Sequence, residues 1–145
     1  MGKKLRWREY SAVAMGGVIG ASLREGIELL LNAKITDHIP MATMFINWGG
    51  SLILAWFYTM TIWRWHFPQW VRAGIGTGII GAFTTFSTFS VESVQLLQQN
   101  VALGMMYVFS SIIGGMGLSW IGIRLAGENP GKAYESKLET SVVRN

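Results

Sequence analysis

Four long apolar stretches, separated by short polar connections, dominate the pattern of hydrophobic and polar positions along the chain. They run from about Tyr10 to Leu31, from about Pro40 to Trp63, from about Val71 to Gln95 and from about Val101 to Leu125. An α-helix of roughly 20 residues is long enough to cross the hydrocarbon core of a bilayer. The pattern therefore predicts an all-α integral membrane protein with four transmembrane helices in a single domain, residues 10–126.

Polar segments flank this predicted membrane domain at both ends. Residues 1–9 form a basic N-terminal segment, and residues 127–145 form a polar segment of mixed charge. The second has too little apolar surface to fold alone, so we expect a flexible C-terminal tail. The apolar run after the basic start is longer than the apolar region of a signal peptide, so we expect it to remain as the first helix.

The composition agrees with a membrane protein and excludes several kinds of chemistry. Hydrophobic residues make up 50% of the 145 residues and charged residues only 14%, which is unusual for a soluble domain. The absence of cysteine excludes disulfides and thiolate chemistry. His38 and His66 fall in predicted loops without a partner at metal-ligand spacing, and no serine elbow, carboxylate pair or phosphate loop is present. We therefore do not expect an enzyme.

Lysine and arginine residues are concentrated on one side of the predicted domain. Ten lie at the N-terminus, in the second connection or at the C-terminus: Lys3, Lys4, Arg6, Arg8, Arg64, Arg72, Arg124, Lys132, Lys137 and Arg144. Lys34 alone lies in the other connections, and Arg24 lies near the end of the first span. Because cytoplasmic loops retain positive charge, both termini are predicted to be cytoplasmic, in a multi-pass protein of the plasma or inner cell membrane. No basic stripe is left over for a nucleic acid.

Small residues recur at helical spacing and predict faces where helices pack closely in lipid. They are Gly16 and Gly20 on the first span, Gly74 and Gly78 on the third, and Ser111, Gly115 and Ser119 on the fourth. Four spans with such faces enclose little space by themselves. We therefore expect a dimer to complete any pathway through the membrane.

Residues 83–90 alternate hydroxyl side chains with aromatic rings in the middle of the third span. Hydroxyl groups at this depth need hydrogen-bond partners or a wet cavity. Helical spacing places Phe86 and Phe89 on one side, and Thr85, Thr88 and Glu92 on another. Ring edges are positive, so phenylalanines beside hydroxyl donors could hold a small anion. Core packing of the two rings is the equally open alternative.

Three other polar positions have two interpretations each. Asn47 either joins two helices by a hydrogen bond or offers an amide N–H to a pore. Arg24 either reaches the interface, paired with Glu28, or attracts an anion at the mouth of a path. Tyr107 with Ser111 either forms a hydroxyl line on the fourth span or lies at the interface.

The segment from Gly81 to Thr84 predicts an interruption of the third helix. An interrupted helix frees backbone carbonyl groups at mid-membrane depth. Freed carbonyl oxygens are suitable ligands for a hard cation such as Na⁺. Hydroxyl groups nearby could satisfy the same carbonyls instead.

Three motifs together resemble the Fluc/CrcB family of fluoride channels. Residues 81–92 (GAFTTFSTFSVE) look like its signature, and residues 16–24 (GGVIGASLR) and 43–51 (TMFINWGGS) are similar to its first-helix and second-helix motifs. The resemblance implies an antiparallel dimer with two fluoride pores. It also implies a passive channel that exports F⁻ from the cytoplasm and a structural Na⁺ at the dimer centre.

Carried over position by position, the resemblance assigns roles to individual residues. The backbone carbonyls of Gly81 and Thr84 from both subunits would hold the Na⁺. The fluoride pathway would comprise Asn47 as a pore amide, Phe86 and Phe89 as an aromatic box, Arg24 in the vestibule, and Ser87, Thr88, Glu92, Tyr107 and Ser111 along a polar track. Glu25, directly after Arg24, departs from the family pattern.

The bias in positive charge predicts how the subunits pair. A subunit that inserts in both orientations should show little bias, whereas this chain has a strong one. We therefore expect a fixed orientation and an oppositely oriented homologous partner, with a homodimer as the alternative. The competing class is a small multidrug-type dimeric transporter of four helices, which needs a carboxylate deep in the membrane; Glu25 and Glu28 lie too near a helix end for that.

Overall fold

The computed structural model describes residues 2–32 and 39–127, and within these ranges every regular element is helical. The elements are α1 (Gly2–Asn32), α2 (Met41–Trp63), α3 (Gln69–Arg72), the π-helical segment η1 (Ala73–Ile80), α4 (Gly81–Phe83), α5 (Phe86–Gln99) and α6 (Val101–Leu125). The prediction of four long helices is confirmed, with α3, η1, α4 and α5 together forming the third. The predicted tail beyond residue 127, together with Lys34 and His38, lies outside the described residues.

Two of the described helices are long and apolar enough to cross a bilayer by length and composition. They are the stretch Gln69–Gln99, which comprises α3, η1, α4 and α5 and has 31 residues and a mean hydropathy of 1.2, and α6, with 25 residues and a mean hydropathy of 1.7. Helix α1 begins at Gly2 and not near Tyr10, so its first turns contain the basic N-terminal residues.

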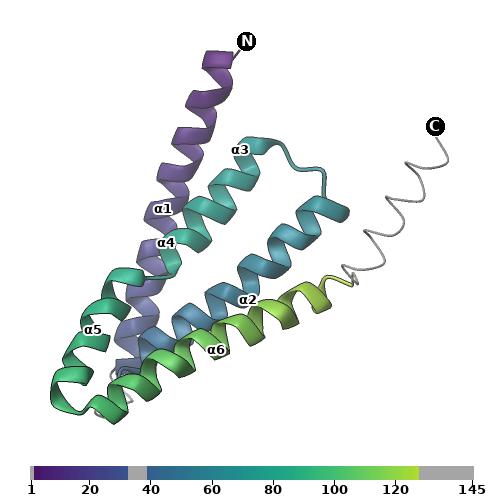
Figure 1. Cartoon of the computed structure of the whole chain (residues 1–145). Helices are drawn as coiled ribbons and strands as arrows, with labels where there is room; N and C mark the ends of the chain where they lie inside the picture. The colour runs from purple at the N-terminus through teal and green to yellow at the C-terminus, as the bar shows by residue number, and fades with distance from the viewer. Residues whose placement is uncertain (1, 33–38, 128–145) are drawn as a thin grey trace.

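The helices form two closely packed pairs (Figure 1). Helix α1 packs along α3, η1 and α4, and α2 packs along α6. Helix α5 leaves α1 and packs on α6 instead. The break between α4 and α5 is therefore the point at which the third span changes its packing partner.

Glycines bring the backbones of α1 and η1 into direct contact. A β-carbon at Gly16 would collide with the carbonyl oxygen of Gly74, and one at Gly20 with the carbonyl oxygen of Ile79. A β-carbon at Gly78 would lie 2.9 Å from the carbonyl oxygen of Val13. This contact confirms the small-residue faces predicted on the first and third spans. Close backbone approach of this kind supplies packing energy in lipid.

The predicted small-residue line on the fourth span is shifted in the structure. The tightest contacts of α6 with α2 are at Gly114, beneath the indole of Trp48, and at Gly122, against the carbonyl oxygen of Leu52. At Gly115 a β-carbon would meet only the hydroxyl of Ser51, at 3.7 Å. The large indole on α2 determines which glycine of α6 must face it, and this requirement is not visible in the spacing of α6 alone.

A single residue, Asn100, joins α5 to α6. Its side-chain Oδ1 accepts hydrogen bonds from the backbone N–H groups of Ala102 at 2.9 Å and Leu103 at 3.3 Å. These bonds cap the N-terminus of α6. The helix ends at Leu125, and Gly127 follows the capping residue Ala126 with a φ of +81°, a conformation that glycine adopts without strain.

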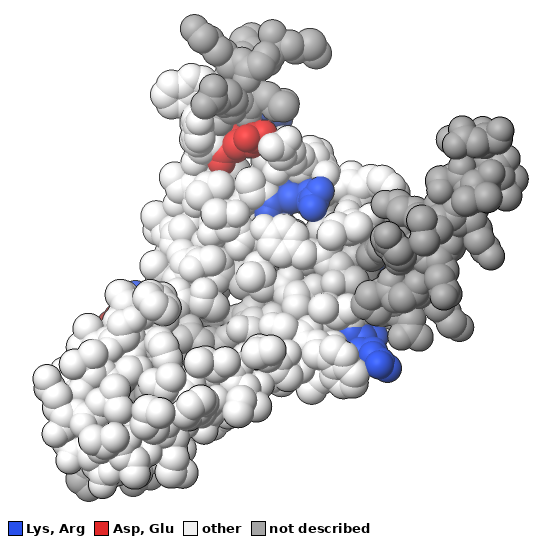
Figure 2. All heavy atoms as spheres, viewed as in Figure 1, with Lys and Arg blue, Asp and Glu red and all other residues white. Residues whose placement is uncertain are grey.

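Few charged side chains are visible on the face shown in Figure 2, where uncharged residues predominate. The N-terminus of α1, the α2–α3 connection and the C-terminus of α6 lie at one end of the molecule (Figure 1). Arg8, Arg64 and Arg124 lie in these segments, and Arg72 is the last residue of the adjoining α3. A largely uncharged surface with arginines at one end is typical of a membrane protein, and the side on which the termini lie stays a prediction.

Candidate functional site at the break in the third span

The third span is interrupted at Thr84 and Thr85. Helix α4 ends at Phe83; Thr84 (φ −78°, ψ 154°) and Thr85 (φ −138°, ψ 121°) are extended, and α5 begins immediately afterwards. The hydroxyl of Thr84 donates to the carbonyl oxygen of Gly81 at 3.2 Å. The predicted interruption near Gly81–Thr84 is confirmed, and it extends to Thr85.

Asn47 of α2 supplies the hydrogen bonds that the interrupted backbone lacks. Its Nδ2 donates to the carbonyl oxygen of Thr85 at 3.0 Å, and its Oδ1 accepts from the N–H of Thr85 at 2.8 Å. Backbone groups have no water to bond with in hydrocarbon, so this pairing stabilises the break. Of the two interpretations of Asn47, the structure contains the hydrogen bond between two helices. The amide nitrogen also has a second N–H.

The hydroxyl of Thr85 organises the start of α5. It accepts from the backbone N–H of Thr88 at 3.2 Å and donates to the Thr88 hydroxyl at 2.9 Å. The Ser87 hydroxyl lies 3.4 Å away from it. Threonine is a favoured N-cap residue because its oxygen satisfies a free N–H in the first turn. The hydroxyl groups of Thr85 and Thr88, which helical spacing placed on one side, thus form a local capping network.

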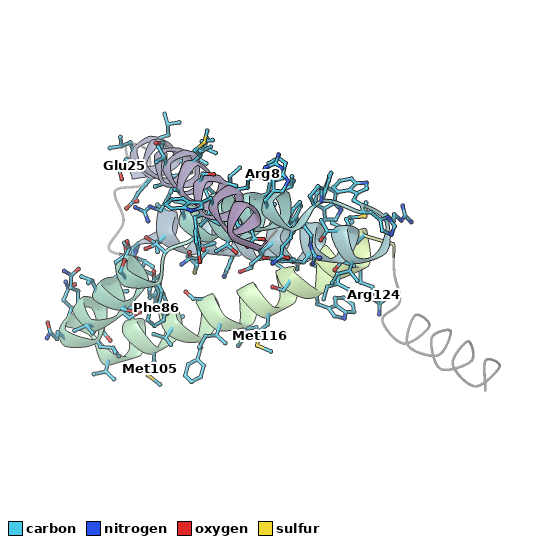
Figure 3. The ribbon with its side chains drawn as sticks, turned by 90° about the horizontal axis from the view of Figure 1, so that it is seen from above. Arg8, Glu25, Phe86, Met105, Met116 and Arg124 are labelled. Atoms are coloured by element: carbon cyan, nitrogen blue, oxygen red, sulfur yellow. The ribbon has the colours of Figure 1, made fainter. Side chains whose placement is uncertain are left out.

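A recess of about 250 Å³ opens beside the break. It is lined by Asn47, Ser51, Leu54, Thr84, Thr85, Phe86 and Phe89, and we call it the break recess. The side chain of Phe86 is 81% exposed, and its ring centroid lies 6.2 Å from that of Phe89. Phe86 lies at the start of α5 (Figure 3). Both predicted phenylalanines and the predicted amide therefore border one open space.

Three helices meet at the carboxyl group of Glu92. The Thr43 hydroxyl of α2 donates to Oε1 at 2.8 Å, and the Tyr107 hydroxyl of α6 donates to Oε2 at 2.8 Å. Thr43 and Tyr107 are buried, and Met44 and Leu96 pack beside Tyr107. We call Glu92, Thr43 and Tyr107 the Glu92 cluster. It joins α2, α5 and α6 by side chains alone.

Three polar residues of α2 face these features at intervals of four residues. They are Thr43, Asn47 and Ser51, which we call the α2 polar stripe. Ser51 borders the break recess and donates to the carbonyl oxygen of Asn47 at 2.8 Å. Of these three residues, only Asn47 has a role predicted from the sequence. Its neighbours one turn away could have been found, because residues four apart share a helix face.

Ser111 and Arg24 each have a buried polar side-chain atom without a hydrogen-bond partner among the described residues. The Ser111 hydroxyl is buried and unpaired among the described residues, whereas the Ser111 carbonyl oxygen accepts from the indole of Trp48 at 3.2 Å. Tyr107 bonds to Glu92 and not to Ser111. Arg24 is half-buried, with an unpaired Nε, and no ion pair joins it to Glu28 in the described part of the chain. The pairing with Glu28, which belonged to one of the two interpretations of Arg24, is thus absent from the described residues, and the role of Arg24 at the mouth of a path stays a prediction.

Backbone oxygens are the candidate cation ligands at this site. Within residues 2–32 and 39–127, no group of three or more His, Asp or Glu residues is arranged to hold a metal ion. The carbonyl oxygen of Gly81 accepts a hydrogen bond from the Thr84 hydroxyl, as in the alternative of local hydroxyl partners. A carbonyl oxygen has a second lone pair, and Gly81 is exposed in the single chain. The carbonyl groups before the break are oxygen donors, which a hard cation prefers, so the donor type fits Na⁺.

These features define a class of protein: an all-helical membrane protein in which one span is broken and a polar stripe of a neighbouring span faces the break. A family model described as CrcB-like protein, Camphor Resistance (CrcB), matches residues 11–123. The chain therefore belongs to the CrcB-like family.

Several relatives have the same name. The chain is 41% identical over 118 residues to the fluoride-specific ion channel FluC 2 of Geobacillus kaustophilus, covering 81% of this chain and 92% of the relative. It is 42% identical over 117 residues to FluC 1 of Bacillus thuringiensis, covering 80% and 85%. It is 40% identical over 135 residues to FluC 2 of Bacillus subtilis, covering 88% and 98%. These relatives are named as ion channels and not as enzymes.

Proposed function

We propose that the chain is a subunit of a fluoride-specific channel that passively exports F⁻ from the cytoplasm. The observation that supports this most directly is the similarity to fluoride-specific channels at about 40% identity over four-fifths or more of the chain. The break recess supplies a physical basis, because it combines ring edges, hydroxyl groups and an amide at one open surface.

The proposed path uses weak donors in place of a buried positive charge. Positive ring edges of Phe86 and Phe89 and the second N–H of Asn47 would contact F⁻ in the break recess. Weak, multiple sites allow an ion both to enter and to leave. An inside-negative potential favours F⁻ exit by roughly 2.3 kcal/mol per 100 mV, so no energy source is needed.

Ser87, Thr88, Glu92, Tyr107 and Ser111 would continue this path beyond the recess. In the Glu92 cluster, two hydroxyl groups each donate to one oxygen of the carboxyl group, and F⁻ accepts the same kind of hydrogen bond. The Ser111 hydroxyl is not engaged with any described residue. Arg24 would attract the anion at the vestibule.

A dimer would complete both the path and the cation site. Phe86 is 81% exposed in the single chain, which leaves the break recess open on one side. Gly81 and Thr84 of one chain offer two carbonyl ligands, so a second copy of the break is needed to surround a structural Na⁺. We propose an antiparallel pair, assembled from this chain and an oppositely oriented homologue, with the termini of this chain in the cytoplasm.

Fluoride efflux from liposomes tests the proposal. The protein is reconstituted alone and together with an oppositely biased homologue of the family, and a fluoride electrode records release with Cl⁻ as the control. We expect rapid F⁻ release, no Cl⁻ release, and full activity only in the mixed sample. Absence of F⁻ release from both samples contradicts the channel proposal, whereas full release from this chain alone contradicts only the heterodimer.

A pair of variants locates the path. Phe86→Ile should slow F⁻ release by about tenfold or more, corresponding to ~1.4 kcal/mol of barrier. Met116→Ile is the matched control, because Met116 is also highly exposed but points away from the other helices (Figure 3). Equal effects of the two changes would place the path elsewhere.

A further inference from the structure

A second open space lies between α1 and the first half of the third span, and it shares no lining residue with the break recess. It has a volume of about 250 Å³, and its walls are almost wholly apolar. Its lining includes Ala12, Met15 and Ile19 from α1 and Val71, Ile75 and Ile79 from the opposite wall. We call it the α1–η1 groove. None of the residues assigned to the fluoride path borders it.

A positively charged side chain, that of Arg8, lies at one end of this groove. Trp70 lines the groove, and the guanidinium carbon of Arg8 lies 5.3 Å from the centroid of its ring. Arg8 precedes Ala12 by one helical turn, so the two share a face of α1. Lys4 lies one turn earlier again in the same helix. The groove thus continues from an apolar floor to a positively charged mouth.

The charge at this end of α1 is uneven. Residues 2–9 contain Lys3, Lys4, Arg6 and Arg8 against the single acid Glu9, a formal charge of +4 − 1 = +3. The groove floor has no charged residue among those that line it. A ligand that matches both parts has one anionic end and one long apolar end.

We propose that the α1–η1 groove binds an anionic phospholipid. The headgroup phosphate pairs with Arg8, and the first part of one acyl chain lies along the apolar floor. Ala12 to Ile19 spans about 10 Å at 1.5 Å per residue, which fits within the roughly 15 Å depth of one leaflet. Trp70 at the mouth suits the headgroup layer, where indole rings are favoured. The outward side of α1 beside the groove is also apolar, with Met15 and Val18 largely exposed.

The chain contains a matched control for the cationic mouth. Arg124 also stacks on a tryptophan, with its guanidinium carbon 4.4 Å from the ring centroid of Trp120. Neither of these two residues borders the α1–η1 groove, and both belong to the C-terminal part of α6; Arg124 is labelled in Figure 3. A general effect of positive charge on lipid binding should be the same at the two stacks.

Native mass spectrometry of the full-length protein tests the proposal. The protein is released from mixed micelles containing equal amounts of phosphatidylglycerol and phosphatidylcholine. We expect preferential retention of phosphatidylglycerol, and we expect Arg8→Gln to reduce this preference about fivefold. Arg124→Gln should leave it unchanged. Met15→Trp, which fills the floor, should lower retention of phosphatidylglycerol while Arg8 is intact; fluoride efflux and circular dichroism verify that each variant is folded.

Four results would overturn the proposal. The first is equal retention of the two lipids by the unmodified protein, and the second is an equal effect of Arg8→Gln and Arg124→Gln. The third is displacement of phosphatidylglycerol by millimolar inorganic phosphate, which would identify a simple anion site. The fourth is a disulfide between two chains of an Ile75→Cys variant in membranes; the chain has no other cysteine, so such a bond would show that a second copy occupies the groove.

Discussion

The contact between α1 and η1 and the contact between α2 and the broken part of the third span use opposite means to hold helices together. At the first, glycines remove side chains, so that Gly16 and Gly20 meet backbone atoms of the opposite helix directly. At the second, side chains of the α2 polar stripe bond to Thr85 and Glu92 across the helix boundary. The first contact is apolar and has an apolar groove beside it, whereas the second is polar and borders the break recess.

The difference shows which part of the molecule can interact with an ion. Close backbone contact gives packing energy in lipid but offers no free donor. Side-chain bonds to a broken helix are needed because unpaired backbone groups are costly without water, and they also place donors at the break. The α1–η1 pair thus acts as a rigid support, and the α2 polar stripe positions the candidate site.

Replacing Asn47 should have the largest effect on stability. Asn47→Leu leaves both the N–H and the carbonyl oxygen of Thr85 without their partner. At roughly 1–3 kcal/mol for each unpaired group, we expect a loss of about 2–6 kcal/mol. Denaturation in detergent, followed by circular dichroism, measures the change, and F⁻ release should be lost as well.

Ser51→Ala is the control on the same stripe. Ser51 bonds only within its own helix, to the carbonyl oxygen of Asn47, so its removal should change the stability by less than about 0.5 kcal/mol. If Asn47→Leu is no more damaging than Ser51→Ala, the break is held by something other than the asparagine.

Adding a single methyl group at Gly20 should disrupt the apolar contact between α1 and η1. Gly20→Ala places a β-carbon against the carbonyl oxygen of Ile79, and we expect a loss of about 1–3 kcal/mol from overpacking. Gly17→Ala is the matched control, since a β-carbon there meets nothing within 4 Å. Alanine favours helix over glycine by about 1 kcal/mol, so this control should be neutral or stabilising in the same denaturation assay. Equal changes in the free energy of unfolding of the Gly20→Ala and Gly17→Ala variants would refute the close contact.

The sequence predicts the elements of this fold better than their contacts. Hydropathy locates the helices, and the glycines and Thr84 predict the interruption, because these signals are local. The bond from Asn47 to Thr85 joins positions in different helices, so spacing within one helix cannot reveal it. The π-helical form of η1 and the pairing of Thr43 with Glu92 depend on packing in the same way.

The Glu92 cluster should contribute less to stability than Asn47. Thr43→Val is nearly isosteric and removes one donor to the carboxyl group of Glu92, so we expect a loss of about 1–2 kcal/mol. Thr59→Val is the control, because the Thr59 hydroxyl donates only to the carbonyl oxygen of Ala55 in its own helix. Glu92→Gln adds a functional test: the glutamine keeps a polar group in the proposed path, so we expect F⁻ release to be slowed but retained, whereas complete loss would show that release requires the carboxylate.

The smallest expected effect is at Asn100, which offers the sharpest comparison with Asn47. Both asparagines form two hydrogen bonds with backbone groups, but Asn100 is exposed at the α5–α6 turn. Water can replace its bonds, so Asn100→Ala should cost about 1 kcal/mol, as for an ordinary helix N-cap. Asn47→Ala in the same denaturation assay should cost at least twice as much, because water cannot reach a buried break as freely. Equal losses at the two positions would show that Thr85 is solvated, and the break would then lie in a wet vestibule instead of an apolar layer.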